Sequence, residues 1–142
     1  MKKTLKVAAA LISYKGKILL SQRKRNDHFA LLWEFPGGGI EKNEKPNQAI
    51  KREIQEELGL IVEPQNLIGK FTDENKYLKI IVYLFGCKII KGKPQAKECA
   101  NFGFFSYNQA KNLNLAPVDG KIMNYLAKNF KLKGSLYERA VV

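Results

Sequence analysis

The chain has few cysteines and no long hydrophobic run. Cys87 and Cys99 are its only cysteines, and their spacing matches neither a C-x-x-C motif nor a metal site, so we expect two free thiols. The basic start resembles a signal peptide, but the apolar run at residues 7–12 is shorter than the roughly 7–15 residues such a peptide needs. No apolar run approaches the ~20 residues of a membrane-spanning helix. These absences favour a cytoplasmic protein with no membrane partner.

Acidic residues are scarce as well. Lys and Arg total 25 against 13 Asp and Glu, which gives a formal net charge of +12. This excess predicts attraction to polyanions, but it does not distinguish nucleic acids from nucleotides or other phosphorylated ligands. The hydrophobic content of 45% over 142 residues is typical of one soluble globular domain. We therefore expect a single domain over residues 1–142, and we assign no structure to the tail at 131–142.

Hydrophobic patterning predicts an α/β fold. Two strands are expected at 6–14 and 16–23, joined by a turn at Lys15-Gly16. Segment 33–41 reads as a short extended piece broken by proline and glycines. Later strands are expected at 67–73, 78–90 and 99–107, and the second of these is apolar enough to be central. The alternation of strands with helical segments predicts a mixed β-sheet with helices packed on it.

Three helices complete the expected fold. The first spans 46–58, with Pro46 near its first turn and Gly59 just past its end. Ser106 is expected to cap a short helix at 107–113, and an amphipathic helix follows Pro117 at 118–130. In the first helix a stripe of Ile50, Ile54 and Leu58 recurs at helical spacing, so this helix should pack on the sheet.

Glu53, Glu56 and Glu57 fall within five residues of the first predicted helix. At 100° per residue they lie within an arc of about 100°, beside the apolar stripe rather than opposite it. Like charges at this spacing repel, and a hard divalent cation such as Mg²⁺ or Mn²⁺ would relieve the repulsion. Arg52, four residues before Glu56, is placed to hold that carboxylate. A solvated charged face is the alternative interpretation.

A longer motif favours the metal-binding interpretation. From Gly38 the chain reads "GGIEKNEKPNQAIKREIQEELGL", which fits G-x5-E-x7-R-E-U-x-E-E-x-G-U, where U is a bulky aliphatic residue. The matching residues are Gly38, Glu44, Arg52, Glu53, Ile54, Glu56, Glu57, Gly59 and Leu60. A chance match is on the order of 10⁻⁹ per starting position. This segment resembles the Nudix box.

The resemblance covers roughly residues 4 to 127. "LLWEFPGGGIE", "SQR" and "LAPVDGKI" are similar to segments of MutT-type nucleoside triphosphate pyrophosphohydrolases and bacterial CTP pyrophosphohydrolases. The resemblance implies the Nudix α/β/α sandwich with a mixed β-sheet. It also implies hydrolysis of a nucleoside diphosphate linked to another group, with a divalent metal held by the glutamates of the box.

The resemblance also implies roles for individual residues. The expected metal ligands are the carboxylates of Glu53, Glu56, Glu57 and Glu98 and a backbone carbonyl of Gly37 or Gly38. Glu53 or Glu98 would accept the proton of the attacking water, and Arg52 belongs to the same catalytic group. Glu98 has an alternative interpretation as a lone surface acid. The expected cofactor is Mg²⁺, with Mn²⁺ possible.

A second group of residues is expected to bind the substrate. It comprises Arg23, His28, Phe35, Pro36, Gly37, Gly38 and Asp119. Arg23 would pair with phosphate, His28 would touch the nucleotide, and Phe35 would pack on the base. These three residues also have simpler interpretations: Arg23 as a surface arginine, His28 as an incidental loop histidine and Phe35 as a core phenylalanine.

At position 119 the chain has aspartate, whereas the MutT enzymes proper that it resembles carry asparagine there. An ionised aspartate only accepts hydrogen bonds and so favours the cytosine amino group. A protonated aspartate could also donate and read an oxidised purine. The alternative is that Asp119 merely caps the final helix.

These observations predict a Mg²⁺-dependent pyrophosphohydrolase that converts (deoxy)nucleoside triphosphates, such as 8-oxo-dGTP or cytosine nucleotides, to monophosphate and pyrophosphate. Such an enzyme would clear oxidised or otherwise non-standard nucleotides. Other possible substrates are ADP-ribose, dinucleoside polyphosphates and RNA 5′ ends. A nucleic-acid-binding module is the alternative from another class, but no helix-turn-helix, zinc or RNA-recognition signature is present. We expect a monomer or homodimer with no stable nucleic-acid partner.

Overall fold

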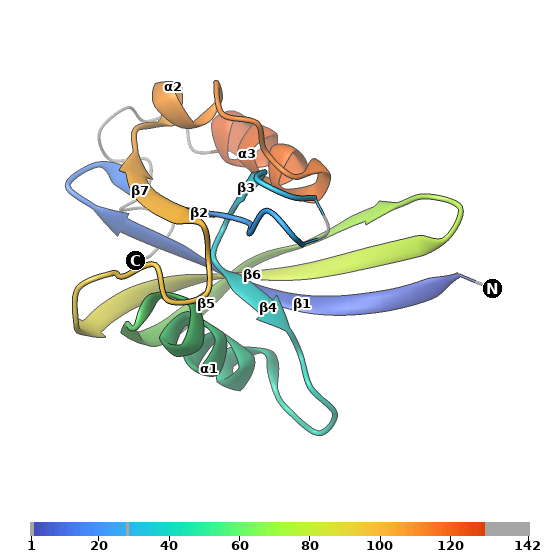
Figure 1. Ribbon diagram of the computed structural model, residues 1–142, viewed down its shortest axis with the longest axis horizontal. Coiled ribbons are helices and arrows are strands. Elements are labelled where there is room, and N and C mark those ends of the chain that lie inside the picture. Colours follow the sequence, from blue (N-terminus) through green and yellow to red (C-terminus); the bar gives the residue numbers. More distant parts are fainter. Residues whose placement is uncertain (1, 28, 130–142) are drawn as a thin grey trace.

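The computed structural model describes residues 2–27 and 29–129, and Figure 1 shows their arrangement. The predictions for His28 and for the tail at 131–142 lie outside these residues. In chain order the elements are β1 (Lys3–Tyr14), β2 (Lys17–Gln22), β3 (Trp33–Glu34), β4 (Gly37–Gly39), α1 (Pro46–Leu58), β5 (Ile61–Glu74), β6 (Leu78–Lys91), β7 (Asn101–Phe105), α2 (Tyr107–Ala110) and α3 (Pro117–Asn129).

The strands form one mixed sheet in the order β3-β2-β1-β6-β5, with β4 paired to β1 and β7 paired to β2. Strands β1 and β6 run parallel from Lys3 to Ile12, whereas the other named pairs are antiparallel. Strand β6 lies between β1 and β5, which confirms that the apolar segment at 78–90 is central. Strands β1, β5 and β6 extend together beyond the helices (Figure 1).

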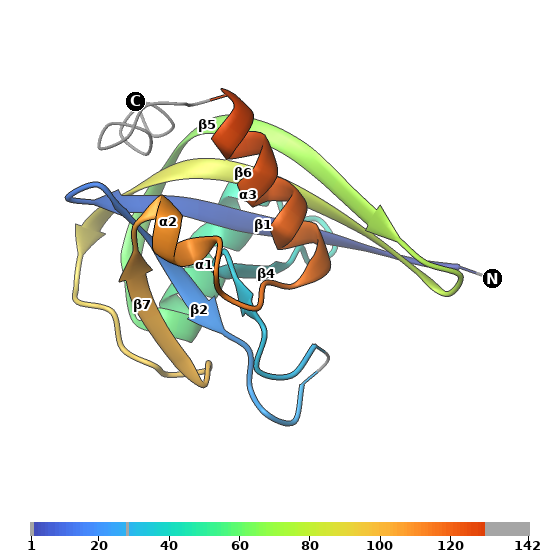
Figure 2. The ribbon, with the colours of Figure 1, turned by 90° about the horizontal axis from the view of Figure 1, so that it is seen from above.

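Helices cover both faces of the sheet. Helix α1 lies on one face and α3 on the other, as the two views show (Figures 1 and 2). Two separate apolar cores result. On the α1 side Ile50 and Ile54 pack with Ala8 and other residues of the sheet, and on the other side α3 packs on β1, β2 and β6. The predicted α/β/α sandwich is confirmed.

The predicted turns are confirmed in detail. Lys15 and Gly16 both have positive φ, 51° and 75°, as a two-residue type I′ hairpin turn requires. Ser106 caps α2, because its Oγ accepts a hydrogen bond of 3.2 Å from the backbone N–H of Gln109.

Several predicted boundaries were wrong. Strand β1 begins at Lys3 rather than at residue 6, and β7 spans Asn101–Phe105 rather than 99–107. Strand β5 begins at Ile61 rather than at residue 67, because it follows β6 antiparallel through register shifts on both sides of Pro64. Helix α2 ends at Ala110 instead of continuing to residue 113. Helix α3 begins at Pro117 itself, the first helical position, where a missing N–H costs nothing.

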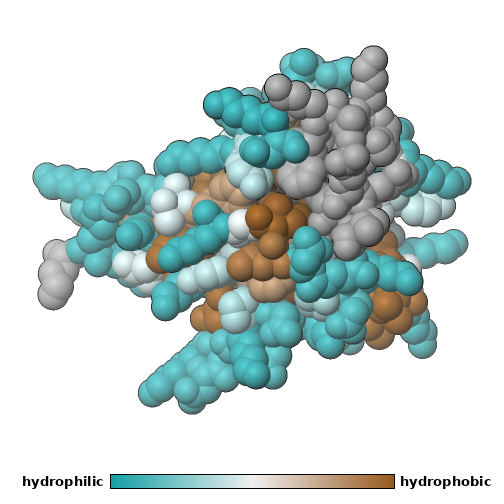
Figure 3. Space-filling view, turned by 180° about the vertical axis from the view of Figure 1, so that it is seen from behind, coloured by the Kyte–Doolittle hydropathy of each residue, from teal (hydrophilic) through white to brown (hydrophobic). Residues whose placement is uncertain are grey.

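The surface carries most of the charge. Figure 3 shows one face on which hydrophilic residues project along the margins and hydrophobic residues gather toward the centre. Individual apolar side chains on the β5 and β6 strands are exposed, among them Leu67 and Ile90. Among the described helices, none is both long and apolar enough to cross a membrane.

Candidate active site

Helix α1 presents the acidic residues of the box along one edge. Gly59 ends the helix in the left-handed conformation with φ 69°, and its N–H donates to the Gln55 carbonyl at 3.0 Å. This ending requires a residue that tolerates positive φ, which explains the glycine of the motif. Because Ile54 and Leu58 are fully buried against the sheet, the direction of the glutamates next to them is fixed.

The three glutamates differ in burial. Glu57 is buried, the Glu53 side chain is 22% exposed, and the Glu56 side chain is 50% exposed. The predicted position at the junction of helix and sheet is confirmed for Glu53 and Glu57, whereas Glu56 faces solvent. The acidic edge leads from solvent at Glu56 to the protein interior at Glu57.

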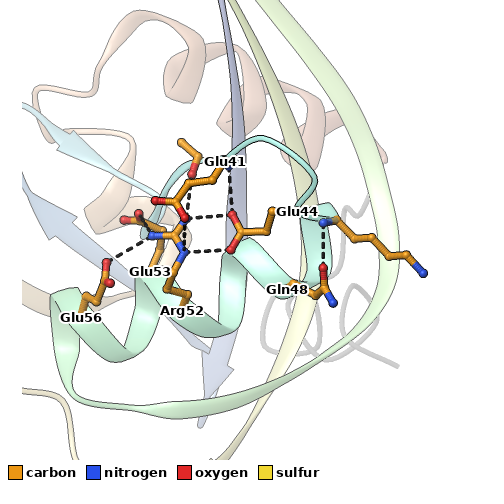
Figure 4. A network of polar contacts seen from close by, with 8 residues as sticks. Glu41, Glu44, Gln48, Arg52, Glu53 and Glu56 are labelled. Atoms are coloured by element: carbon orange, nitrogen blue, oxygen red, sulfur yellow. Dashed lines mark hydrogen bonds and ion pairs between the residues drawn. The ribbon is translucent and has the colours of Figure 1, made fainter.

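Arg52 connects four carboxylates, as Figure 4 shows. Its Nε and Nη2 donate to the two carboxylate oxygens of Glu44 at 2.8 and 2.9 Å. Its Nη1 donates to Glu53 at 2.6 Å and to Glu56 at 3.3 Å, which confirms the predicted contact with Glu56. A further ion pair reaches Glu41 at 3.7 Å. The hydrogen bonds from Arg52 lower the pKa of Glu44 to about 2.

The same guanidinium also holds the glycine segment. Arg52 Nη2 donates to the carbonyl of Gly39 at 3.0 Å. Strand β4 is thereby tied to α1 from one side, and it pairs with β1 on the other. One arginine thus fixes both the backbone of β4 and the carboxylates that face it.

Glycine is required at two positions of β4. A Cβ on Gly37 would overlap the carbonyl oxygen of Ala8, and a Cβ on Gly38 would overlap the carboxyl group of Glu53. A Cβ on Gly39 would meet nothing within 4 Å. The structure therefore brings the Gly38 backbone into direct proximity with the Glu53 carboxylate, as the prediction of a shared site requires.

Glu57 is a buried carboxyl group that accepts a hydrogen bond from Ser21. Ser21 on β2 is fully buried, and its Oγ donates a hydrogen bond of 2.7 Å to Glu57 Oε1. Burial raises the pKa of Glu57 to about 8, the Ser21 hydrogen bond opposes this rise, and the nearby charges of Glu34 and Glu53 add to it.

Glu34 is a charged residue of the site that the sequence analysis missed. It pairs with Arg23, whose Nη1 donates to Glu34 Oε1 at 3.0 Å, and Arg23 also contacts Asp27 at 3.3 Å. Burial raises the pKa of Glu34, and Arg23 partly offsets the rise. Its position between Trp33 and Phe35 was the available signal, because strand residues alternate between faces.

Asp119 lies on α3, on the face of the sheet opposite to α1. Its Oδ1 accepts a hydrogen bond of 2.9 Å from the backbone N–H of Phe35, which joins α3 to the segment between β3 and β4. Asp119 is 5% exposed, and burial raises its pKa well above the ordinary value. It lies inside the first turn of α3, so an end-capping role alone does not account for its bond to Phe35.

Phe35 and Pro36 are both buried. The Phe35 side chain belongs to the core under α3, which favours the simpler of its two predicted roles. The Phe35 backbone nevertheless reaches the site through Asp119.

The loop between β6 and β7 brings Glu98 to the end of α1. The backbone N–H groups of Lys97 and Glu98 both donate to the Glu57 carbonyl at 3.1 Å, and that of Gln95 donates to the Leu58 carbonyl at 2.9 Å. These bonds satisfy carbonyls that the helix end leaves unpaired. The Glu98 side chain is exposed, and its predicted place beside the box is consistent with this anchoring.

The predicted metal ligands form no ready-made cage. Among the described residues no three His, Cys, Asp or Glu side chains stand close enough to hold an ion. Arg52 binds Glu53 and Glu56, and Ser21 binds Glu57. The donor set nevertheless fits Mg²⁺ or Mn²⁺, which prefer carboxylate and carbonyl oxygens together with water and phosphate. The close approach of Gly38 to Glu53 brings backbone and carboxylate oxygens, the two kinds of ligand that such a site needs, next to each other.

Comparisons with known proteins identify the family of the chain. The NUDIX domain model matches residues 2–126. The chain is 35% identical over 117 residues to the CTP pyrophosphohydrolase of Escherichia coli (strain K12), which covers 82% of this chain and 87% of that protein. It is 34% identical over 129 residues to the 8-oxo-dGTP diphosphatase of Haemophilus influenzae, which covers 88% and 93%.

A solved structure shares the fold. The MutT protein from Methanosarcina mazei Go1 superposes with a TM-score of 0.81 at 23% identity, over 92% of this chain and 98% of that one. Together with the family match over residues 2–126, these similarities show that the chain belongs to the NUDIX family.

Proposed function

We propose that the protein is a Mg²⁺-dependent pyrophosphohydrolase that converts nucleoside triphosphates to a monophosphate and pyrophosphate. The observation that carries this proposal is the acidic edge of α1, where Glu53 lies against the backbone of Gly38, Arg52 binds Glu53 and Glu56, and Ser21 binds Glu57. The relatives named CTP pyrophosphohydrolase and 8-oxo-dGTP diphosphatase support the same reaction class.

The three glutamates and a carbonyl of Gly37 or Gly38 would hold the metal, with Glu98 completing the set. When bound, Mg²⁺ or Mn²⁺ would neutralise the charge that develops on the phosphate oxygens. Arg52 keeps the Glu53 carboxylate in one orientation through the 2.6 Å hydrogen bond. Phosphate hydrolysis depends on this kind of positioning more than on covalent catalysis.

Glu53 and Glu98 are the two candidates for the general base. Glu53 is fixed by Arg52 and by its contact with Gly38. Glu98 is anchored only through its backbone, at the Glu57 carbonyl. Glu53→Gln and Glu98→Gln separate them when turnover is measured at saturating Mn²⁺. Saturation offsets the loss of a metal ligand, so the variant that lacks the base should show the larger loss of kcat.

The base of the nucleotide would bind at the other end of the site. Asp119 and Glu34 are two mostly buried carboxyl groups with raised pKa values, and a neutral carboxyl group can donate as well as accept a hydrogen bond. Such a pair could read the amino group of cytosine or the altered edge of an oxidised purine. Arg23 lies next to Glu34 and is placed to pair with a phosphate or the base.

The test is a panel of CTP, dCTP, 5-methyl-dCTP, 8-oxo-dGTP and 2-hydroxy-dATP with Mg²⁺, monitored for pyrophosphate and monophosphate. Glu57→Gln should lower turnover by more than ~100-fold with the fold intact, since even outer partners of metal ligands contribute about 10–100-fold. Glu63→Gln is the matched control, because Glu63 is exposed and pairs with Lys51 at 3.6 Å. Retained turnover in Glu57→Gln would reject the proposal.

The same panel addresses the alternatives. Release of products only from ADP-ribose, a dinucleoside polyphosphate or an RNA 5′ end would place the protein in another branch of the family. Tight, steeply salt-dependent binding of oligonucleotides without hydrolysis would favour the nucleic-acid-binding module that the net charge of +12 first suggested.

A further inference from the structure

Ser21 is a fully buried hydroxyl residue in the middle of the sheet. It lies on β2, opposite Glu34 on β3 and Phe102 on β7 in the strand register. With Glu57 and Asp119 it makes up the buried polar and charged residues of the part of the chain that the structure describes. Its Oγ donates to Glu57 Oε1 at 2.7 Å across 36 positions of sequence.

Packing alone does not require the oxygen of Ser21. At the nearby interior positions Ala8 and Ala10 of β1, a methyl group suffices to pack against α1. A hydroxyl group buried without a partner is costly, so its presence is explained by the acceptor that it meets. That acceptor is the carboxylate of the most buried of the three box glutamates.

The hydrogen bond fixes the orientation of this carboxylate. With Oε1 engaged by Ser21, rotation of the Glu57 carboxyl group is restrained and Oε2 is left for another partner. Glu57 also lies near the like charges of Glu34 and Glu53 and the opposite charge of Arg23. These charges pull the carboxyl group in different directions, so the Ser21 hydrogen bond is what defines its orientation. Outer partners that orient a ligand are common in metal sites and strengthen metal affinity.

We propose that Ser21 is a positioning residue that holds Glu57 ready to bind the divalent metal and thereby sets the metal affinity of the site. This inference rests on the proposed function, in which Glu57 is a metal ligand. Ser21 itself touches neither the metal nor the nucleotide. Its contribution should therefore appear in metal binding before any substrate is added.

The experiment measures Mn²⁺ binding to the metal-free protein by electron paramagnetic resonance, without nucleotide. Ser21→Ala should weaken Mn²⁺ binding by about tenfold, the lower end of the effect of removing an outer partner. Ser21→Thr, which keeps the hydroxyl group, should stay within about threefold of the unsubstituted protein. Circular dichroism establishes that each variant is folded.

Ser106→Ala provides the matched control. It removes a hydroxyl group that caps α2, which typically costs about 1 kcal/mol, but it leaves the Ser21–Glu57 contact intact. It should lower the melting temperature without changing Mn²⁺ affinity. An equal loss of affinity in Ser21→Ala and Ser106→Ala would show a general effect of stability and overturn the proposal.

Two further outcomes are decisive. Mn²⁺ affinity within twofold of the unsubstituted protein in Ser21→Ala would refute the positioning role while leaving the proposed function intact. Unchanged Mn²⁺ affinity in Glu57→Gln would instead remove Glu57 from the ligand set, and the proposed metal site would fail first. The two failures are therefore distinguishable in one titration series.

Discussion

The buried carboxyl group of Glu57 should make the metal-free protein less stable as the pH rises. Its pKa is raised to about 8 from the ordinary 4.5, chiefly by burial. Below pH 4.5 the group is protonated in both the folded and the unfolded state. Between the two values the unfolded state loses the proton while the folded state keeps it, so the free energy of unfolding falls. Above pH 8 the loss is complete.

The size of the effect follows from the shift. At 1.36 kcal/mol per pKa unit, the loss of stability approaches about 5 kcal/mol. Between pH 5 and pH 8 the change due to Glu57 is about 3–4 kcal/mol. In Glu57→Gln the amide oxygen can still accept the Ser21 hydrogen bond, but no charge is buried. The variant should therefore be more stable than the unsubstituted protein at pH 8, and the two should be nearly equal at pH 4.5.

The assay is urea unfolding with a chelator at pH 5, 6, 7 and 8 and constant ionic strength. The free energy of unfolding of Glu57→Gln should still fall as the pH rises, but less steeply than that of the unsubstituted protein. The remaining fall is expected because burial also raises the pKa values of Glu34 and Asp119. Parallel curves for Glu57→Gln and the unsubstituted protein would refute the reasoning, since they would show that Glu57 binds its proton equally in both states. The control Glu63→Gln should follow the unsubstituted protein at every pH.

Three other predictions concern metal, backbone and base. A hundredfold excess of Mg²⁺ over its Kd should raise the melting temperature by about 5–10 °C, and Glu56→Gln should remove most of that gain in a calorimetric scan. Gly38→Ala should lower turnover by about tenfold or more, because the added Cβ displaces Glu53, whereas Gly39→Ala should remain active. Asp119→Asn should shift the ratio of kcat/KM for dCTP over 8-oxo-dGTP by about tenfold towards 8-oxo-dGTP, and an unchanged ratio would remove Asp119 from base recognition.

The sequence predicted those parts of the site whose geometry is local. The spacing of Glu53, Glu56 and Glu57 along one helix fixes their relative positions, and so does the Arg52–Glu56 contact four residues apart. Gly59 likewise ends the helix by a local rule. These features follow from helical geometry alone, before any tertiary contact forms.

The parts of the site that the sequence did not predict depend on how the strands pair. Ser21 meets Glu57 across 36 positions and Asp119 meets Phe35 across 84, and no periodicity predicts which residues become opposed. Strand β5 was shortened in the prediction because Pro64 and the polar residues after it interrupt the hydrophobic pattern. In the structure the strand continues through register shifts at that point, which only its neighbour β6 could impose.

The charge distribution explains why the acidic edge and the basic surface occur in one protein. Residues 41–63 carry six acids and four bases, so the rest of the chain holds a net charge of +14. That field attracts polyphosphates from a distance, but the α1 carboxylates repel a bare triphosphate at close range. Arg52 alone offsets only part of this repulsion, since four carboxylates share its one charge. A nucleotide that arrives with its divalent cation would satisfy both the distant attraction and the local requirement. Under the proposed function, the acidic edge would therefore favour the metal-bound form of the substrate.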